Sequence, residues 1–248
     1  MPSHNLAGLR FELHNARHIA SYETWYQVFN MERRAYGAKY KREPEEVDTF
    51  LGAPGERLQL YRDLRRYPNA YNRILGNMYL RPRIAMAYQT NPNHPDQLVG
   101  SIWSAQTVRG SSPVARTTAA VLSRLGIRPG ELNLRNVAVE PVAQARGIAS
   151  ALALVSIEGA RATQGVTIDV HAEVPSSIDI LANHGFERPY YDPDNPELEW
   201  QIDHCFGPDQ EPGQLIRMTS TVGDLRDALM SRPGADEALA YIRENTTS

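Results

Sequence analysis

The 248-residue sequence has one cysteine, Cys205, and contains no run of about 18 apolar residues, the length that a membrane-spanning helix needs. A single cysteine cannot form an internal disulfide, and no cysteines and histidines have the spacing of zinc ligands. The first residues also lack the apolar core of a signal peptide. The sequence therefore predicts a cytoplasmic protein with no membrane span and no metal.

A surplus of basic residues is also missing, because 26 Lys and Arg stand against 29 Asp and Glu, a formal net charge of −3. Proteins held mainly by nucleic-acid phosphates are usually basic, so this balance argues against a nucleic-acid partner. Apolar residues at 42% and charged residues at 22% are close to the globular average. The chain is expected to fold around a core of its own.

Local patterns predict alternating helices and strands. Apolar spacings of three and four indicate helices near 18–40 and 56–67, and β-rich runs indicate a hairpin of strands 84–89 and 97–106. Residues 113–125 look helical and form an insertion, about 108–130. Residues 132–139, 147–164 and 166–172 then form a strand–helix–strand unit, which normally makes parallel neighbours.

Beyond this unit we expect a short helix at 176–183 and a late strand at 197–206. The tail near 221–245 carries apolar residues at helical spacing, interrupted by Pro233 and Gly234. These patterns predict one domain over residues 1–206, with N-terminal helices at about 18–67. Residues 207–248 are expected to form a helical extension that packs on this domain.

The segment Leu134–Ser150 is the most informative part of the chain. It resembles the acetyl-CoA-binding motif of the GNAT superfamily of N-acetyltransferases, in which a strand and a short turn lead to Gln/Arg-x-x-Gly-x-Gly/Ala at the start of a helix. Residues Gln144–Ala149, QARGIA, fill every fixed place of that pattern. Taken alone, such a turn is more often an ordinary strand-to-helix connection. The order of elements over about 83–206, with Gly185 and Phe186 after the second helix, favours the family.

Elementary chemistry agrees with the resemblance, because a helix N-terminus presents unpaired N–H groups and a positive dipole to an anion. Gly147 lets the backbone approach a phosphate closely, and Arg146 can add charged hydrogen bonds. The resemblance implies that the backbone of the preceding strand pairs with the pantetheine arm. The implied acetyl-CoA site comprises Val137, Ala138, Val139, Gln144, Ala145, Arg146, Gly147, Ile148, Ala149 and Ser150.

The resemblance also implies the fold class. It is an α/β fold with a mixed, mostly antiparallel central sheet flanked by helices, and a parallel pair of strands splays apart at the CoA site. Two positions depart from the family pattern, because Val174 stands where an asparagine is frequent and Leu181 where a tyrosine acts as general acid. Tyr190 and Tyr191 are the phenols nearest to Leu181 in sequence.

A base must deprotonate an attacking amine, and Glu131 and His171 are the two candidates. Glu131 precedes the strand that leads to the CoA turn, although Asn133 is an alternative for that place, and His171 ends the strand after the CoA helix. The catalytic candidates are therefore Glu131, His171 and Tyr190. We expect Glu140 to be a solvated loop acid or a helix-cap partner, and Cys205 a buried thiol without a catalytic role.

The resemblance implies an N-acetyltransferase that moves an acetyl group from acetyl-CoA to a primary amine by direct attack. The acceptor is a small-molecule amine or an amine of a peptide or protein, and a homodimer is left open. Leu181 and Val174 motivate an alternative, a CoA-binding regulatory or interaction protein with weak or no catalysis. A transferase of a different acyl group is a third reading.

Overall fold

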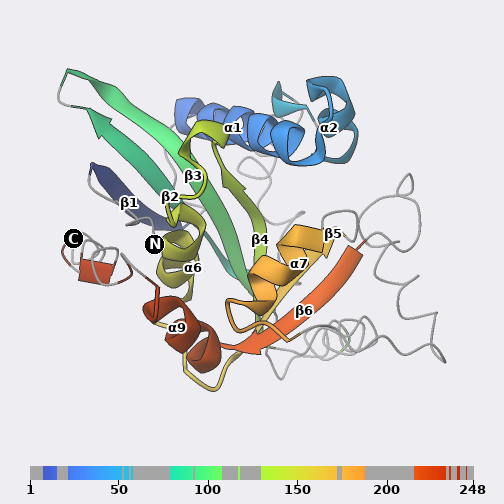
Figure 1. Cartoon of the computed structure of the whole chain (residues 1–248), viewed down its shortest axis with the longest axis vertical. Coiled ribbons are helices and arrows are strands. Elements are labelled where there is room, and N and C mark those ends of the chain that lie inside the picture. The colour runs from blue at the N-terminus through green and yellow to red at the C-terminus, as the bar shows by residue number, and fades with distance from the viewer. Residues whose placement is uncertain are drawn as a thin grey trace.

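The computed structural model describes residues 8–15, 22–51, 53–55, 57, 79–91, 93–107, 117, 130–171, 175–187, 215–232, 235, 239–240 and 244. Its elements are labelled in Figure 1. They are β1 (Leu9–Asn15), α1 (Tyr22–Tyr40), α2 (Pro44–Leu51), β2 (Tyr79–Asn91), β3 (His94–Thr107), β4 (Leu132–Val139), the 3-10 turn η1 (Pro141–Ala143), α6 (Ile148–Ile157), β5 (Gly165–His171), α7 (Pro175–Ala182), β6 (Leu215–Thr221) and α9 (Val222–Met230).

The strands form one six-stranded sheet in the order β1-β2-β3-β4-β5-β6. Every neighbouring pair is antiparallel except β4 and β5, which run parallel and are connected through α6. A parallel pair needs such a crossover, and the predicted strand–helix–strand unit supplies it. The predicted mixed, mostly antiparallel sheet with one parallel pair is confirmed.

Helices cover both faces of this sheet (Figure 1). On one face, α6 and α9 pack on a large apolar core that includes Phe11, Ile102 and Leu152. On the other face, α1 packs on a smaller core that includes Met86 and Leu98. Alternate residues of β2 supply the two cores, as the period of two of a strand requires. The sheet is therefore sandwiched between helices.

Helix α1 buries only part of the stripe that spacings of three and four indicate for residues 18–40. Phe29 of that stripe is buried, but Tyr22 and Tyr26, at the same spacing, are 54% and 49% exposed. The buried side instead carries Trp25 and Val28, and Trp25 stacks on Trp103 of β3 with ring centroids 5.0 Å apart. Trp25 and Val28 face the sheet and the two tyrosines do not. Burying a phenol requires a hydrogen-bond partner, which favours the exposed position for the tyrosines.

Two further predictions need correction. Helix α6 ends at Ile157 and not at Gln164, because Glu158 is already extended and Gly159 has a φ of 75°. Residues 207–248 are not purely helical, since Leu215–Thr221 form β6 of the central sheet.

Several predicted elements lie outside the described residues. They are the late strand at 197–206, most of the helix at 56–67 and, apart from two positions, the insertion at 108–130. The described helices include none that is both long and apolar enough to cross a membrane. In the described part of the chain, no three His, Cys, Asp or Glu side chains gather as metal ligands.

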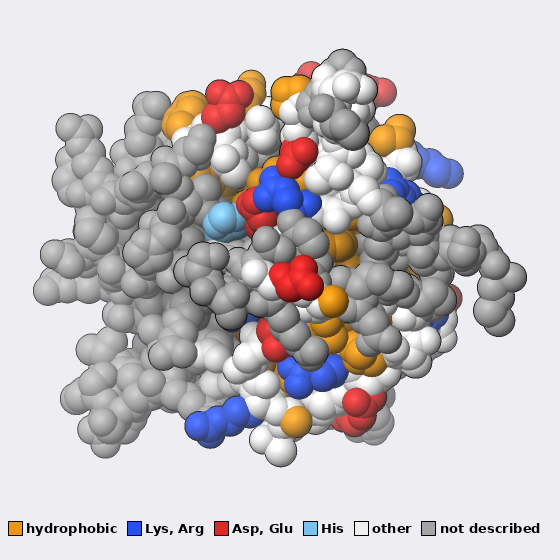
Figure 2. All heavy atoms as spheres, turned by 90° about the vertical axis from the view of Figure 1, so that its left-hand side faces the viewer, with side chains coloured by type: hydrophobic (Ala, Val, Ile, Leu, Met, Phe, Trp, Pro, Cys, Tyr) orange, Lys and Arg blue, Asp and Glu red, His pale blue; other side chains and the backbone are white. Residues whose placement is uncertain are grey.

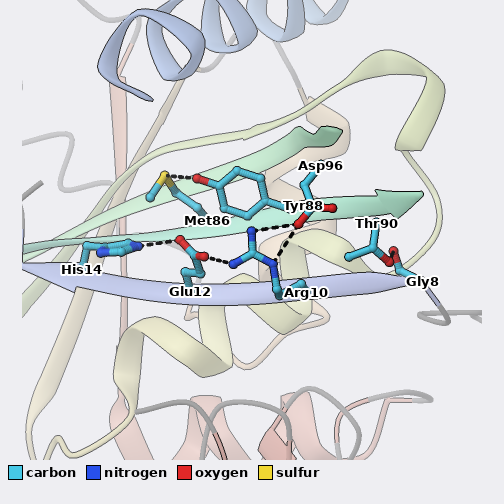
Figure 3. A network of polar contacts seen from close by, with 8 residues as sticks. All are labelled: Gly8, Arg10, Glu12, His14, Met86, Tyr88, Thr90 and Asp96. Atoms are coloured by element: carbon cyan, nitrogen blue, oxygen red, sulfur yellow. Dashed lines mark hydrogen bonds and ion pairs between the residues drawn. The ribbon is translucent and has the colours of Figure 1, made fainter. Parts of the chain in front are cut away.

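β1 is an edge strand whose polar face is charged. Arg10, Glu12 and His14 project from the same face, and Arg10 lies between Glu12 and Asp96 of β3 (Figure 3). The Arg10 guanidinium also covers the ring of Tyr88, 4.7 Å from its centroid. Figure 2 shows the side of the molecule that lies on the left in Figure 1, where acidic and basic side chains are interspersed. Charges of this kind are typical of an edge that does not pair further.

Candidate functional site

The sheet opens between β4 and β5. Among the described residues these strands pair only at Leu132–Leu134 with Val166–Ile168. β4 continues to Val139 and remains paired with β3 through Ala138 and Val139. Beyond Leu134, therefore, one edge of β4 is bonded to β3 while its other edge faces the gap. Backbone N–H and C=O groups along such an edge can bind an extended ligand as an additional strand.

A bulge reorients β4 at the point where the gap begins. Ser101 pairs with Ala138 and Trp103 with Arg135, so Asn136 and Val137 together stand opposite Ile102. Asn136 has a φ of 46°, a left-handed conformation that asparagine tolerates better than most residues. An inserted residue reverses which face later side chains meet.

The burial of β4 shows this reversal. Before the bulge, Leu132 and Leu134 belong to the core on the α6 side. After it, Ala138 belongs to the core on the α1 side, while Val137 and Val139 pack toward α6. The bulge thus presents Val137 and Val139 to the same side as the start of α6.

The turn between β4 and α6 is tight. The Glu140 N–H donates to the Val99 carbonyl at 2.9 Å, and the Ala143 N–H donates to the Glu140 carbonyl at 2.8 Å. Ala145 and Gly147 then adopt φ values of 61° and 86°, and Gly147 is the N-cap of α6. A glycine cap has no side chain to satisfy the helix N–H groups. The first turn of α6 is therefore left with backbone donors directed outward.

A cavity of about 490 Å³ joins the open edge of β4 to this turn. Its volume is within the range of small-molecule sites. The walls come from α1, β3, β4, η1, α6, β5, α7 and α9, and most lining side chains are apolar. The lining residues are Ala35, Tyr36, Lys39, Ile102, Leu134, Val137, Ala138, Val139, Ala143, Gln144, Ala145, Gly147, Ile148, Ala149, Ser150, Ala153, Ile168, Ile180, Leu181, His184, Phe186, Leu225 and Leu229.

Nine of the ten predicted acetyl-CoA residues line this cavity. Arg146 is the exception, because its Nη1 atom donates to Oε1 of Gln89 on β2 at 2.7 Å. A cation is nevertheless present, since Lys39 of α1 lies in the wall. Lys39 is exposed overall, but partial desolvation lowers the pKa of its ammonium. Positive potential at the cavity comes from the α6 N-terminus and Lys39.

His184 and Ser150 form a hydrogen-bonded pair in the wall. Ser150 Oγ lies 2.8 Å from His184 Nε2, and His184 Nδ1 is bonded to the Ile180 carbonyl. A carbonyl accepts only, so Nδ1 carries the proton and Nε2 of the neutral ring accepts from Ser150. Burial lowers the pKa of His184, Arg232 adds to this effect, and the bond to Ile180 opposes it.

Of the predicted catalytic residues, the structure describes Glu131 and the backbone of His171. The Glu131 side chain packs over Gly165, since a Cβ atom added at Gly165 would lie 2.8 Å from Glu131 Cγ. Glu131 is not among the residues that line the cavity. At roughly 3.3 Å per residue it is about 20 Å along the chain from Val137. His171 ends β5, and its backbone pairs with Leu215, whereas Tyr190 lies outside the described residues. Asn133, the alternative to Glu131, is buried and donates to Thr167 Oγ1 at 2.9 Å.

Glu140 is not a solvated loop acid, and although it is the N-cap residue of η1 its side chain makes no cap hydrogen bond. It is 5% exposed and forms an ion pair with Arg34 of α1, whose Nε donates to Glu140 Oε1 at 3.0 Å. A buried carboxylate needs such a partner. Because Glu140 begins the turn, this ion pair fixes the turn against α1.

Sequence reasoning assigned no site role to Lys39 or His184. Lys39 is a cation in the last turn of α1, where it also has an ordinary role. His184 precedes Gly185, whose φ of 86° marks the turn after α7. The histidine therefore directly follows the predicted helix at 176–183. No local signal connects it with Ser150, 34 residues earlier.

No protein-family model and no curated protein matches the sequence. Solved structures that are similar include a PaiA N-acetyltransferase from Thermoplasma acidophilum in complex with coenzyme A, at 13% identity and a TM-score of 0.46, covering 85% of this chain and 98% of that one. A spermidine N-acetyltransferase from Vibrio cholerae in complex with CoA and spermine matches at 12% identity and a TM-score of 0.48, covering 87% and 98%. Escherichia coli ElaA matches at 9% identity and 0.41, covering 86% and 99%.

Proposed function

We propose that the cavity binds acetyl-CoA and that the chain is an N-acetyltransferase that moves the acetyl group to a primary amine. The observation that supports this most strongly is that one cavity connects the open edge of β4 to the first turn of α6. These two features would hold the amide-bearing arm and the anionic end of one elongated ligand.

Each part of the cavity has a role in this proposal. The N–H groups at Ile148, Ala149 and Ser150 bind the pyrophosphate, aided by the helix dipole. The open backbone edge at Val137 and Val139 pairs with the pantetheine amides in the manner of an added strand. Apolar side chains such as Ile168 and Phe186 cover the arm and exclude water.

The reaction that this site would run is direct acetyl transfer. The bound thioester supplies an activated acetyl group, which the neutral amine nitrogen attacks. The carbon–sulfur bond breaks, the amide forms, the amine loses one proton to a base and the CoA thiolate gains one. We propose His171 as the base, because it lies at the end of β5 where the two strands have separated.

The other catalytic candidates have different standing. Glu131 lies at the closed end of the β4–β5 pair, next to Gly165, so it is a weaker candidate for the base. Leu181, at the place of the usual general acid, lines the cavity and cannot donate a proton. Tyr190 remains the proposed donor to the thiolate.

We propose that the acceptor is a small-molecule amine or an amine of a peptide or protein, and that the enzyme acts in the cytoplasm. Tyr36 and Lys39 bring α1 into the wall of the cavity that α7 also lines. The acceptor would therefore approach between α1 and the end of β5. We also propose a domain over residues 1–206 and an extension over residues 207–248, whose strand β6 pairs with β5 in the central sheet.

Turnover tests the proposed function. Purified protein is incubated with acetyl-CoA and a panel of polyamines, amino acids and N-terminal peptides, and release of free CoA is measured. We expect acceptor-dependent release, and we expect His171→Ala to lower kcat by about 100-fold if the imidazole is the base. Saturable acetyl-CoA binding without turnover on any acceptor would favour the regulatory alternative. An unchanged kcat in His171→Ala would remove that residue from the mechanism.

A further inference from the structure

The Ser150–His184 pair lies where the proposed function places the pyrophosphate. Ser150 is in the first turn of α6, whose N–H groups point outward, and both side chains line the cavity. Phosphate oxygens accept hydrogen bonds and donate none, so Ser150 can contribute only through its O–H. In the structure, however, that proton is directed to Nε2 of His184, 2.8 Å away.

The direction of this hydrogen bond depends on the ring. His184 Nδ1 is held by the Ile180 carbonyl, which requires a proton on that nitrogen. A neutral ring therefore accepts at Nε2 and occupies the Ser150 proton. A protonated ring donates from Nε2 to Ser150 Oγ, and the serine O–H is then free to turn toward an anion.

We propose that His184 sets the direction of the Ser150 hydroxyl, so that the CoA pyrophosphate binds together with a proton that His184 takes up from solvent. This inference rests on the proposed function. His184 is a positioning residue in this scheme, because it acts on the ligand through Ser150. The pyrophosphate gains a hydroxyl donor and a nearby imidazolium charge, while the ring gains an anionic neighbour.

Other ionisable groups surround His184. Arg232, after α9, donates to the Asn183 carbonyl at 2.8 Å and opposes a positive charge on the ring. Lys39 and Tyr36 of α1 share the cavity. Asp179 of α7 lies near His184 in sequence. Asp224 of α9 accepts a hydrogen bond from Thr221, and its carbonyl oxygen would lie 3.2 Å from a Cβ atom at Gly185, the residue after His184. In the free protein, burial and Arg232 favour the neutral ring, so the bound anion is what reverses the balance.

The test measures binding of 3′-dephospho-CoA between pH 5.5 and 7.5 by calorimetry. This probe keeps the pyrophosphate but lacks the phosphate monoester, which would itself titrate near pH 6. For wild type we expect Kd to rise by up to about tenfold per pH unit within the window, with net uptake approaching about one proton. Proton uptake is read from the binding enthalpy in buffers of different ionisation enthalpy.

Three variants test the His184–Ser150 relay, in which the imidazole sets the direction of the serine hydroxyl. His184→Gln and Ser150→Ala should each bind with little pH dependence and without the extra proton. His14→Gln, which removes a histidine on β1 away from the cavity, should retain both. ¹⁵N spectra of the imidazoles should show one ring, absent in His184→Gln, changing from the Nδ1–H tautomer to the doubly protonated form when the probe is added.

The outcomes are distinct. Binding of the probe with equal pH dependence in wild type and His184→Gln, or with a His184 ring that stays neutral, would overturn the relay and leave the CoA site intact. No binding of the probe to folded wild type at any pH would overturn the proposed function and the relay with it. Circular dichroism of each variant checks that a flat profile does not come from unfolding.

Discussion

At the scale of single residues, two uncommon backbone conformations shape the site. Asn136 and Ala145 are non-glycine residues with positive φ, and both lie between the start of β4 and the start of α6. The first makes the bulge that turns Val137 toward the cavity, and the second makes the turn before Gly147. Conformations of this kind persist only where the surrounding structure holds them, and they cluster at functional sites.

Asn136→Val tests the bulge. A β-branched side chain disfavours left-handed backbone, so we expect a loss of about 1–2 kcal/mol in the free energy of unfolding and weaker acetyl-CoA binding. Asn136→Gly is the matched control, since glycine accepts this φ and should keep both properties nearly unchanged. Urea unfolding and calorimetry measure the two effects. Equal stability of the two variants would mean that the bulge is not held at this residue.

Glu32 offers a second residue-scale prediction. Its side chain is fully buried between α1 and β3, where Trp103 Nε1 donates to it at 2.7 Å and Arg57 Nη2 at 2.6 Å. Arg57→Ala would leave a buried carboxylate without its counter-ion, at a cost of about 3–5 kcal/mol in unfolding free energy. Glu32→Gln with Arg57→Ala should recover part of that loss. Urea unfolding in which Arg57→Ala costs less than 1 kcal/mol, against the expected ~3–5, would show that Glu32 is not destabilised.

At the scale of elements, the Arg34–Glu140 ion pair connects α1 to the turn between β4 and α6. Arg34 is 56% exposed and Glu140 is buried, so solvent screens one partner and not the other. A double-mutant cycle with Arg34→Met and Glu140→Gln should give a coupling energy of about 1–2 kcal/mol in unfolding. Arg34→Met should also raise the Kd for acetyl-CoA, because the turn loses its anchor. Additive effects of the two changes would argue that the pair does not couple the helix to the turn.

Elements with a strong local pattern were predictable. Apolar and β-branched residues, bounded by glycine, fixed β4 at Leu132–Val139, and the Gly147 motif located the start of α6 to within one residue. β1 was missed although Leu9, Phe11 and Leu13 alternate with polar residues, a period-two pattern typical of a half-buried strand. β6 was missed because it follows a passage rich in proline and glycine, and its pairing partner β5 is distant in sequence.

The cavity itself could be predicted only in part. Its phosphate end follows from a contiguous motif, so nine lining residues were named in advance. Its other walls come from α1, α7 and α9, and the contacts among them depend on the tertiary fold. The Ser150–His184 bond and the Glu140–Arg34 ion pair join residues that no periodicity connects. Distant pairings of this kind are not available from local patterns.

At the scale of the whole molecule, stability should depend on the protonation of His184. Burial lowers the pKa of its ring below 6.5, so the unfolded chain binds this proton more readily than the folded one. The free energy of unfolding therefore falls as pH decreases from 6.5 toward the lower folded value, and is fully retained above 6.5. Without ligand, His184→Gln should lose less Tm than wild type between pH 7.5 and 5.5. A variant that loses as much Tm as wild type would contradict this assignment.

The central claim is that the turn into α6 receives the anionic part of acetyl-CoA, and calorimetric titration of Gly147→Asp tests it most directly. Gly159→Asp is the matched control, because Gly159 also has a positive φ, 75° against 86°, and a Cβ there would meet nothing within 4 Å. Both changes add the same charge and similar backbone strain, the first at the N-cap of α6 and the second just beyond its C-terminal end. We predict saturable binding to wild type and to Gly159→Asp, and none to a folded Gly147→Asp. Equal binding to all three proteins, or no binding to wild type, would contradict the account.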